Sequence, residues 1–378
     1  MAKYVVSNGS PLDDVSSTGS SYDDGSAENG VWGGERGSES RLYVLNRGGT
    51  GEVHYLLLTP DRSDIFMYRT HIEVWKPLVD IMNFGVVVVD NFLYIVGGFD
   101  KSRAQHLNRV LRYDPAEGLW VECAPMMIAR AKCGVCAQGG RIYVSGGEKS
   151  DSRVTGSCEV YDIQTDTWCK AGMLVAARAN HVCAVYNNEI YCAGGYHGNK
   201  TQDNLWVYEE HTWRELDEHY PHTLPCSLDR FTIATLDNTF YFIGGVTSRV
   251  DRKCPDKPDY STQRGIFSFT TNISLSNGTI RDDVISPWEF HLPNMNHARH
   301  SHGTATIGRK LYVVGGSCLE TGQPVNVCEF YNTETGEWEE DFRFRKGDMS
   351  NVVCAILEVP RIPVNERKMT NRLKWVLW

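Results

Sequence analysis

Short apolar runs that end in a Gly-Gly pair recur along this chain at nearly constant intervals. The six runs are RLYVLNRGG, FLYIVGG, RIYVSGG, EIYCAGG, TFYFIGG and KLYVVGG, and their second glycines are Gly49, Gly98, Gly147, Gly195, Gly245 and Gly316. The first five pairs are almost evenly spaced, and the sixth follows after a longer interval. A period of about 50 residues built on strand-like runs is typical of a repeat architecture in which each unit forms one small sheet.

The polar and apolar positions inside one unit predict four strands. Residues 83–127 contain the runs FGVVVVD, FLYIVGG, RVLRYDP and LWVECAPM, separated by polar turns such as Asp90-Asn91. The first two runs are apolar on both faces, as in strands buried between neighbouring sheets. The last two alternate more, so we expect them nearer to solvent. The sequence therefore predicts an all-β fold.

Aromatic residues follow four of the six Gly-Gly pairs in a fixed order. Tyr and Trp lie seven positions apart in three units and five apart in a fourth: Tyr113 and Trp120, Tyr161 and Trp168, Tyr331 and Trp338, Tyr208 and Trp213. Large rings at one place in every sheet pack one sheet on the next. The ordered Gly-Gly, Tyr and Trp positions resemble the kelch repeat. The resemblance implies a six-bladed kelch β-propeller over residues 41–360.

Two units depart from the pattern. In residues 220–291 the interval from the Gly-Gly pair to Trp288 is much longer than elsewhere, because of insertions around 246–265 and 270–287, and the tyrosine is replaced by Phe267 or Phe269. The first unit lacks an apolar run before Arg41. Residues 350–360, SNVVCAILEVP, resemble the missing run. We expect the C-terminal strand to close the first blade, which removes free sheet edges. The alternative is a self-contained hairpin of 41–46 and 53–58.

The two ends of the chain differ in composition from the repeats. Residues 7–40 are rich in Ser, Gly and Asp, and such a segment cannot offset its ordering entropy. We therefore assign 1–40 as a disordered N-terminal segment, in which Tyr4 to Val6 could form a short strand. The basic and aromatic segment 361–378 is either a partner-docking tail or a tail that packs on the propeller or frays.

Charge and cysteine usage narrow the possible partners and compartment. The net charge of −9 disfavours bulk attraction to nucleic acid or anionic membranes. No apolar stretch is long enough for a membrane helix, and the N-terminal MAKYVVSNGS lacks the layout of a signal peptide. Most of the 12 cysteines lie inside apolar runs, where a free thiol behaves as a small hydrophobe. This pattern favours a reducing, cytoplasmic location.

The sequence offers no convincing catalytic or metal-binding constellation. Cys133 and Cys136 have a zinc-like spacing, but residues three apart in a strand point to opposite faces. His297, His300 and His302 are close together, and their ordinary interpretation is polar loop residues. Some kelch-type propellers are copper oxidases, but no converging set of His and Tyr ligands is evident here. We therefore expect a non-catalytic domain without metal or cofactor.

A second recurrence concerns basic residues. An arginine precedes the inner run of four consecutive units: Arg130, Arg178, Arg230 and Arg299. Three of them stand sixteen positions before the first glycine of the pair, and Arg230 stands fourteen before it. Equivalent offsets predict equivalent positions around one mouth of the channel, where Asn83 and Ser350 would stand in the other two units. Arginine binds carboxylates and phosphates in bidentate fashion. Alternatively, these side chains bond carbonyls between blades, and both interpretations stay open.

The loops after the Gly-Gly pairs should lie on the same face as these arginines. They supply candidate peptide-binding residues, because loops on a rigid scaffold hold function and aromatics beside cations anchor peptides. The candidates are Phe99, Arg103, Lys149, Arg153, Tyr196 and His197.

The resemblance extends to the kelch domains that follow BTB and BACK domains. In that family this face binds a degron or another short peptide. The resemblance implies a substrate receptor of a cullin-3 ubiquitin ligase that recognises an acidic or phosphorylated peptide. Cullin-3 would bind only through an upstream BTB domain outside this chain. The alternatives are a scaffolding or cytoskeleton-binding kelch domain and a copper-oxidase-like propeller.

Overall fold

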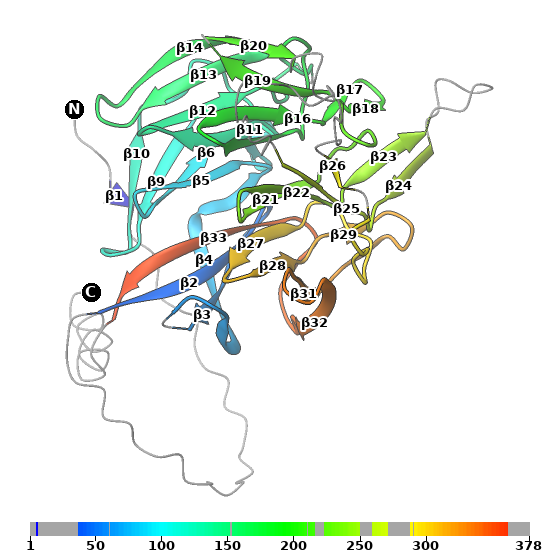
Figure 1. The fold of residues 1–378 in the computed structure, drawn as a ribbon. Helices are drawn as coiled ribbons and strands as arrows, with labels where there is room; N and C mark the ends of the chain where they lie inside the picture. Colours follow the sequence, from blue (N-terminus) through cyan, green and yellow to red (C-terminus); the bar gives the residue numbers. More distant parts are fainter. Residues whose placement is uncertain are drawn as a thin grey trace, which may run out of the picture.

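The computed structural model describes residues 5–6, 37–59, 61–151, 153–209, 211–215, 223–249, 259–270, 288–289 and 291–361. All regular structure in these residues is β, arranged as six antiparallel sheets around a central axis with three additional two-stranded hairpins (Figure 1). Within them, no helix is long and apolar enough to cross a membrane. The predicted six-bladed propeller is confirmed.

Each blade consists of four strands, named below in order from the inner strand to the outer one. The first two blades contain β33 (Val352–Pro360), β2 (Ser38–Asn46), β3 (Gly48–Leu58) and β4 (Ile65–Met82), then β5 (Gly85–Val89), β6 (Phe92–Val96), β9 (Val110–Asp114) and β10 (Leu119–Cys123). The third and fourth contain β11 (Gly134–Gln138), β12 (Arg141–Ser145), β13 (Ser157–Asp162) and β14 (Thr167–Met173), then β15 (Val182–Tyr186), β16 (Glu189–Ala193), β19 (Leu205–Glu209) and β20 (Thr212–Glu215). The fifth and sixth contain β21 (Thr232–Leu236), β22 (Thr239–Ile243), β25 (Ile266–Phe269) and β26 (Trp288–Glu289), then β27 (Gly303–Ile307), β28 (Lys310–Val314), β31 (Val327–Asn332) and β32 (Glu337–Arg343).

The C-terminal strand closes the ring. β33 pairs antiparallel with β2 from Ser38 opposite Pro360 to Asn46 opposite Val352. The inner strands β5, β11, β15, β21, β27 and β33 then contact one another in a complete circle. The predicted closure is confirmed, and the alternative of a self-contained hairpin is wrong because β2 has β33 on its other side (Figure 1).

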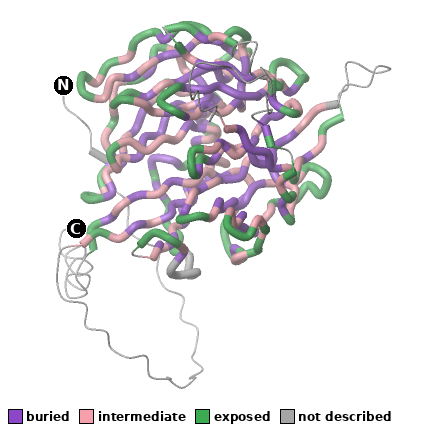
Figure 2. Tube along the Cα trace, viewed as in Figure 1, coloured by how far each residue is buried: buried purple, intermediate pink, exposed green. Residues whose placement is uncertain are grey.

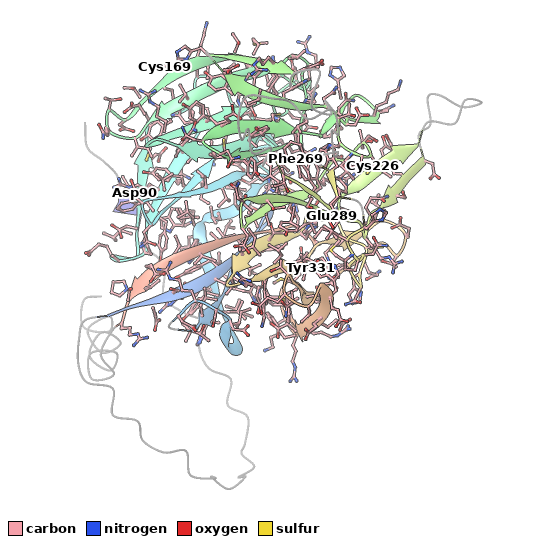
Figure 3. All side chains as sticks on the ribbon, viewed as in Figure 1. Asp90, Cys169, Cys226, Phe269, Glu289 and Tyr331 are labelled. Carbon is pink, nitrogen blue, oxygen red and sulfur yellow. The ribbon has the colours of Figure 1, made fainter. Side chains whose placement is uncertain are left out.

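The recurring aromatics pair within their own blade and also pack one sheet on the next, which was the prediction: the ring of Trp75 in the first blade lies 4.6 Å from that of Tyr113 and 5.2 Å from that of Trp120 in the second. Tyr113 lies directly opposite Trp120, with ring centroids 5.0 Å apart. In the irregular fifth blade Phe269, rather than Phe267, takes the tyrosine position, directly opposite Trp288 at 4.9 Å (Figure 3). Buried apolar clusters lie between neighbouring sheets all around the ring (Figure 2).

The Gly-Gly pairs allow the blades to approach one another. Gly146 and Gly147 have φ of 58° and 97°, which L side chains rarely adopt. A Cβ on Gly146 would lie 2.5 Å from the carbonyl oxygen of Arg178 in the next blade. After the pairs of the other five blades the chain forms a short hairpin or loop at the same end of the channel, whereas Gly48 and Gly49 already belong to β3. The hairpins are β7 (Phe99–Asp100) with β8 (Gln105–His106), β17 (Tyr196–His197) with β18 (Lys200–Thr201), β23 (Val246–Arg249) with β24 (Asp259–Thr262), and β29 (Ser317–Cys318) with β30 (Gln323–Pro324).

The two ends of the chain are described only in part. The predicted disorder of 7–36 and the role of the tail 362–378 fall outside the described residues. Ser38 to Ser40, which the sequence assigned to the disordered segment, begin β2 instead, because β33 extends far enough to pair with them. Near the N-terminus, β1 (Val5–Val6) pairs with the outer strand β10. The insertion of the fifth blade is described as β23 and β24 on either side of 250–258.

Candidate functional site

Three of the four predicted channel arginines are buried inside the blades. Arg130, Arg178 and Arg299 are 0% exposed, so their guanidinium groups cannot reach a ligand in the channel. The prediction that these three form a basic crescent is wrong. The alternative was that they bond carbonyls between blades; they do bond main-chain carbonyls, but those of the blade that each arginine begins.

Each buried arginine satisfies the carbonyl at its own Gly-Gly turn. Arg130 Nη1 donates to the carbonyl oxygens of Gly146 and Ser157, both at 2.7 Å, and Nη2 donates to Glu159 at 2.6 Å. Glu159 also accepts bonds from the main-chain N–H groups of Met127 and Ile128, which connect the second blade to the third. A strand-end carbonyl buried without a donor would be destabilising, and the arginine supplies that donor.

The same arrangement recurs with small changes in two further blades. Arg299 donates to Gly315 and Val327 at 2.9 Å and pairs with the buried Glu329 at 2.6 Å. Arg178 donates to Gly194 at 2.7 Å, but its guanidinium lies over the ring of Trp206, 3.6 Å from the centroid. An arginine sixteen positions before the first glycine of the pair is therefore a structural residue.

The residue two positions after the buried-arginine position of each repeat places its side chain at the channel. Arg230 occupies it, and its main-chain φ of 52° is close to the positive φ of its equivalents in four other blades. The side chains of these positions line one cavity. We call them, with the two residues that complete the circle in the first blade, the entrance ring: Asn83, Lys132, Asn180, Arg230, Ser301, Asn351 and Arg47.

Main-chain hydrogen bonds join the entrance ring into a closed circle. The ring residues of the second to sixth blades each donate the main-chain N–H to the carbonyl of the ring residue in the preceding blade, from Asn83 to Arg47 at 3.0 Å through to Ser301 to Arg230 at 2.9 Å. The peptide group between Asn351 and Val352 completes it, because its oxygen accepts from Arg47 and its N–H donates to Ser301. The ring thus holds its side chains on a rigid frame.

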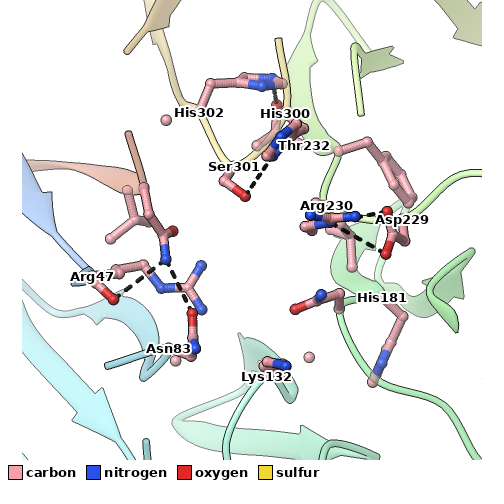
Figure 4. A pocket seen from close by; sticks show the side chains of 18 of the residues that line it. Arg47, Asn83, Lys132, His181, Asp229, Arg230, Thr232, His300, Ser301 and His302 are labelled. Carbon is pink, nitrogen blue, oxygen red and sulfur yellow. Dashed lines mark hydrogen bonds and ion pairs between the residues drawn. The ribbon is translucent and has the colours of Figure 1, made fainter. Parts of the chain in front are cut away.

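The cavity inside the ring is roomy and carries more cations than anions. Its volume is about 780 Å³, and its floor is formed by the first residues of the inner strands. Arg47, Lys132 and Arg230 line it, whereas Asp229 is the one carboxylate among its lining residues (Figure 4). The predicted residues Asn83, Ser350 and Tyr196 also line it.

Arg47 differs from the other two cations because it has no acidic partner among the described residues. It is half-buried, its Nε makes no hydrogen bond, and its guanidinium lies 6.0 Å from the ring of Phe84. Burial lowers the pKa of Arg47, and no carboxylate compensates for the lost water. A carboxylate or phosphate brought into the cavity would supply that partner.

The other two cations are paired within the site. Arg230 Nε lies 3.1 Å from Asp229, a carboxylate whose pKa burial raises despite this contact (Figure 4). Lys132 Nζ lies 3.0 Å from Glu148, whose carboxylate also accepts a hydrogen bond from the hydroxyl of Tyr196. Both cations keep part of their side-chain surface exposed, 28% for Lys132 and 30% for Arg230.

The loop candidates lie at this end of the molecule but outside the cavity lining, with the exception of Tyr196. Arg103 and Arg153 are 73% and 79% exposed and pair with acids of their own loops, Asp100 and Asp151. The remaining three keep local contacts as well. Phe99 packs edge-on against His106, the N–H of Lys149 donates to Arg153, and His197 Nδ1 lies 2.8 Å from the carbonyl of Ala177.

Sequence reasoning missed Arg47 and Lys132. Lys132 precedes Gly146 by the same interval that separates Arg230 from Gly244, so the repeat spacing could have located it. No repeat spacing predicts that Arg47 lines the cavity, because it is one of the extra residues that make RLYVLNRGG longer than FLYIVGG. The extra length of that run was the available signal.

The histidines considered as metal ligands make ordinary polar contacts. His302 Nε2 lies 2.7 Å from Thr232 Oγ1, and His300 Nδ1 lies 3.0 Å from Ser301 Oγ (Figure 4). His297 pairs with Glu340 on the outer strand β32. Burial, reinforced by the charge of Arg230, lowers the pKa of His300 to about 4, so it is neutral at neutral pH.

Comparison with known families supports the architecture. Residues 83–271 match the model of the KLHDC2/KLHL20/DRC7 Kelch-repeats domain, and residues 298–340 match the Kelch motif. The first match covers half of the chain. The chain therefore belongs to the kelch-repeat family, and its repeats form a β-propeller.

Known proteins with similar sequences carry the same repeats. Kelch-like protein 26 of Danio rerio is 25% identical over 281 residues, covering 73% of this chain and 42% of that protein. Kelch repeat and BTB domain-containing protein 1 of vaccinia virus (strain Copenhagen) is 25% identical over 287 residues, covering 74% and 46%. This chain thus spans less than half the length of these relatives. The solved structure of YjhT has the same fold, with a TM-score of 0.63 at 14% identity over 81% of this chain and 97% of that one.

Proposed function

We propose that this chain is a non-catalytic protein-binding domain that takes an acidic or phosphorylated segment of a partner at the entrance ring. The observation that carries the proposal is Arg47, a half-buried guanidinium in the cavity without an acidic partner among the described residues. Lys132 and Arg230 stand at the same entrance and extend its positive charge. A carboxylate or phosphate there would accept bidentate bonds from a donor set that the fold has already positioned.

Selection of peptides from a random displayed library tests this proposal. Panning against the wild-type chain should enrich sequences rich in Asp and Glu, and binding should fall at least tenfold in Arg47→Gln and in Arg230→Gln. Arg153→Gln is the matched control, because Arg153 is exposed on a loop outside the cavity. Enrichment of uncharged peptides, or equal binding by all variants, would contradict the proposal.

We further propose that the partner is a substrate for ubiquitination. In this proposal the longer gene product carries a BTB domain that binds cullin-3 in the reducing cytoplasm. Support comes from the relatives, some of which are named for both kelch repeats and a BTB domain. The full-length product should co-purify with cullin-3, whereas this chain alone should not. A product without cullin-3 binding that cosediments with actin filaments would favour the scaffolding alternative and leave the acidic-ligand result unaffected.

A further inference from the structure

We propose a second site, a buried binding site for a thiophilic d10 metal ion (Zn²⁺ or Cu⁺) between the third and fourth blades. Its ligands are His181, Cys183 and Cys192, with Cys136 as the fourth. Ligand atoms of the first three residues all lie within 4.8 Å of one another. Thiolates and imidazole are the donor set that such ions prefer. This site is independent of the entrance-ring proposal and revises the expectation of a metal-free domain.

The ligands come from adjacent strands that the blade packing brings together. Cys183 on β15 is the direct cross-strand partner of Cys192 on β16, and His181 precedes Cys183 by two positions. Cys136 belongs to β11, the neighbouring inner strand, and lies in the same buried cluster as Cys183 and Cys192. In a tetrahedral site with bonds of about 2.3 Å, sulfur ligands stand about 3.8 Å apart. His181, Cys183 and Cys192, whose ligand atoms lie within 4.8 Å of one another, therefore need only small side-chain shifts, whereas Cys136 must turn further toward them.

The surroundings of the imidazole keep the proposed site polar and open. His181 is 5% exposed, yet its Nδ1 makes no hydrogen bond. Its Nε2 faces Ser145 Oγ at 2.8 Å, and the same hydroxyl lies 2.9 Å from Cys183 Sγ. A side chain on Gly134 would collide with both the imidazole and the thiol, at 2.6 and 2.7 Å, so the glycine keeps this space open.

Equivalent positions in other blades show that the propeller does not need these residues for packing. In the fourth blade, His181, Cys183 and Cys192 stand thirteen, eleven and two positions before the first glycine of the pair. The same positions hold Phe84, Val86 and Ile95 in the second blade and Phe231, Ile233 and Phe242 in the fifth. Ordinary apolar side chains fill the same place there, whereas the sixth blade repeats the histidine as His302 and holds Thr304 and Val313 in place of the two cysteines.

The ion has a route to the site and a source of negative charge. His181 and Cys183 line the central cavity, so an ion can arrive from the channel. Binding would release the protons of the coordinating thiols to solvent and leave thiolates on the metal.

Cobalt substitution of the reduced, metal-free chain tests the site directly. Adding Co²⁺ to the wild type should produce thiolate-to-cobalt charge-transfer and tetrahedral d–d bands that saturate at one ion per chain. Zn²⁺ should abolish these bands by displacement. A parallel anaerobic titration with Cu⁺ against a Cu⁺ chelator decides which ion is preferred. Absence of the bands in the wild type would overturn the proposal, whatever the variants do.

Two variants locate the site. Cys192→Ala should lose the bands and the stabilisation by metal, whereas Cys328→Ala, an equally buried cysteine in the sixth blade, should retain both. Ser145→Ala should weaken metal binding by about 10- to 100-fold, as expected for a neighbour that orients a ligand. Equal bands in Cys192→Ala and Cys328→Ala would overturn the assignment.

Discussion

At the scale of single residues, a shift of two positions along the chain decides whether an arginine is structural or faces the channel. Arg130 lies sixteen positions before its Gly-Gly pair and is fully buried, whereas Arg230 lies fourteen before its own and lines the cavity. The two positions differ because the earlier side chain points into the blade, whereas the later residue adopts a positive φ and places its side chain on the entrance ring.

Replacing a buried arginine should destabilise the fold. Arg130→Ala and Arg299→Ala each leave a buried carboxylate, Glu159 or Glu329, without its partner. We expect each to lower the free energy of unfolding by about 3–5 kcal/mol, measured by urea denaturation. Arg153→Ala, at an exposed site, should change it by less than about 0.5 kcal/mol. Similar losses in all three variants would contradict this account.

The buried His300 should make stability depend on pH. Its pKa is about 4 in the folded chain and 6.5 as the ordinary value, because burial and Arg230 oppose its protonation more than Glu320 favours it. Below pH 6.5 the unfolded chain therefore binds the extra proton, and stability falls until about pH 4. The loss amounts to about 3 kcal/mol.

Thermal unfolding measured at about pH 7 and about pH 4.5 checks this expectation. His300→Gln should lose less stability between the two pH values than the wild type does. The exposed His291→Gln is the control and should behave as the wild type. An unchanged pH dependence in His300→Gln would show that this imidazole does not titrate as described.

At the scale of elements, the strands of the regular blades could be predicted from the local pattern of apolar and polar residues. The first blade also needed a strand that is distant in the sequence. The second blade could be drawn from sequence almost residue by residue, since its strands β5, β6, β9 and β10 match the four predicted runs. The first blade required a strand from the opposite end of the chain. Sequence could predict that strand because an unpaired inner position is unfavourable and residues 350–360 matched the missing pattern.

Removing the closing strand should prevent the propeller from forming. A chain ending at Asn351 lacks β33, which exposes β2 as a free edge and opens the apolar clusters that contain Val352, Ala355 and Leu357. We expect an aggregated or unfolded product by circular dichroism and size-exclusion chromatography. A chain ending at Arg361 retains β33 and should unfold cooperatively. Cooperative unfolding of both chains would contradict the role given to closure.

At the scale of the whole molecule, the charge of the cavity lining is opposite in sign to the net charge of the chain. The chain carries −9 overall, yet the cavity lining holds three basic residues and one acidic residue. Short-range contacts to Arg47 should outweigh the long-range repulsion of an acidic ligand, because charges beyond about 8–10 Å are screened at physiological salt. An acidic partner is thus compatible with an acidic protein.

The dependence of affinity on ionic strength should show whether attraction at the entrance ring or repulsion by the net charge governs binding. If an acidic peptide binds at the entrance ring, its affinity should fall as salt rises from about 0.1 M to about 1 M, where the screening length shrinks to about 3 Å. Fluorescence anisotropy with a selected peptide measures this trend. Affinity that rises with salt would indicate that net repulsion dominates and that the peptide binds elsewhere.

The sequence by itself determined the number of blades, the order of their strands and the segment that closes them. These features depend on period, alternation and turn residues, which are local properties of the chain. Only the tertiary structure decided which polar residues meet. Arg47 faces the cavity because of an irregularity in one blade, and Cys136 of the third blade packs with Cys183 and Cys192 of the fourth. Such contacts follow from the packing of sheets, and no spacing along the chain encodes them.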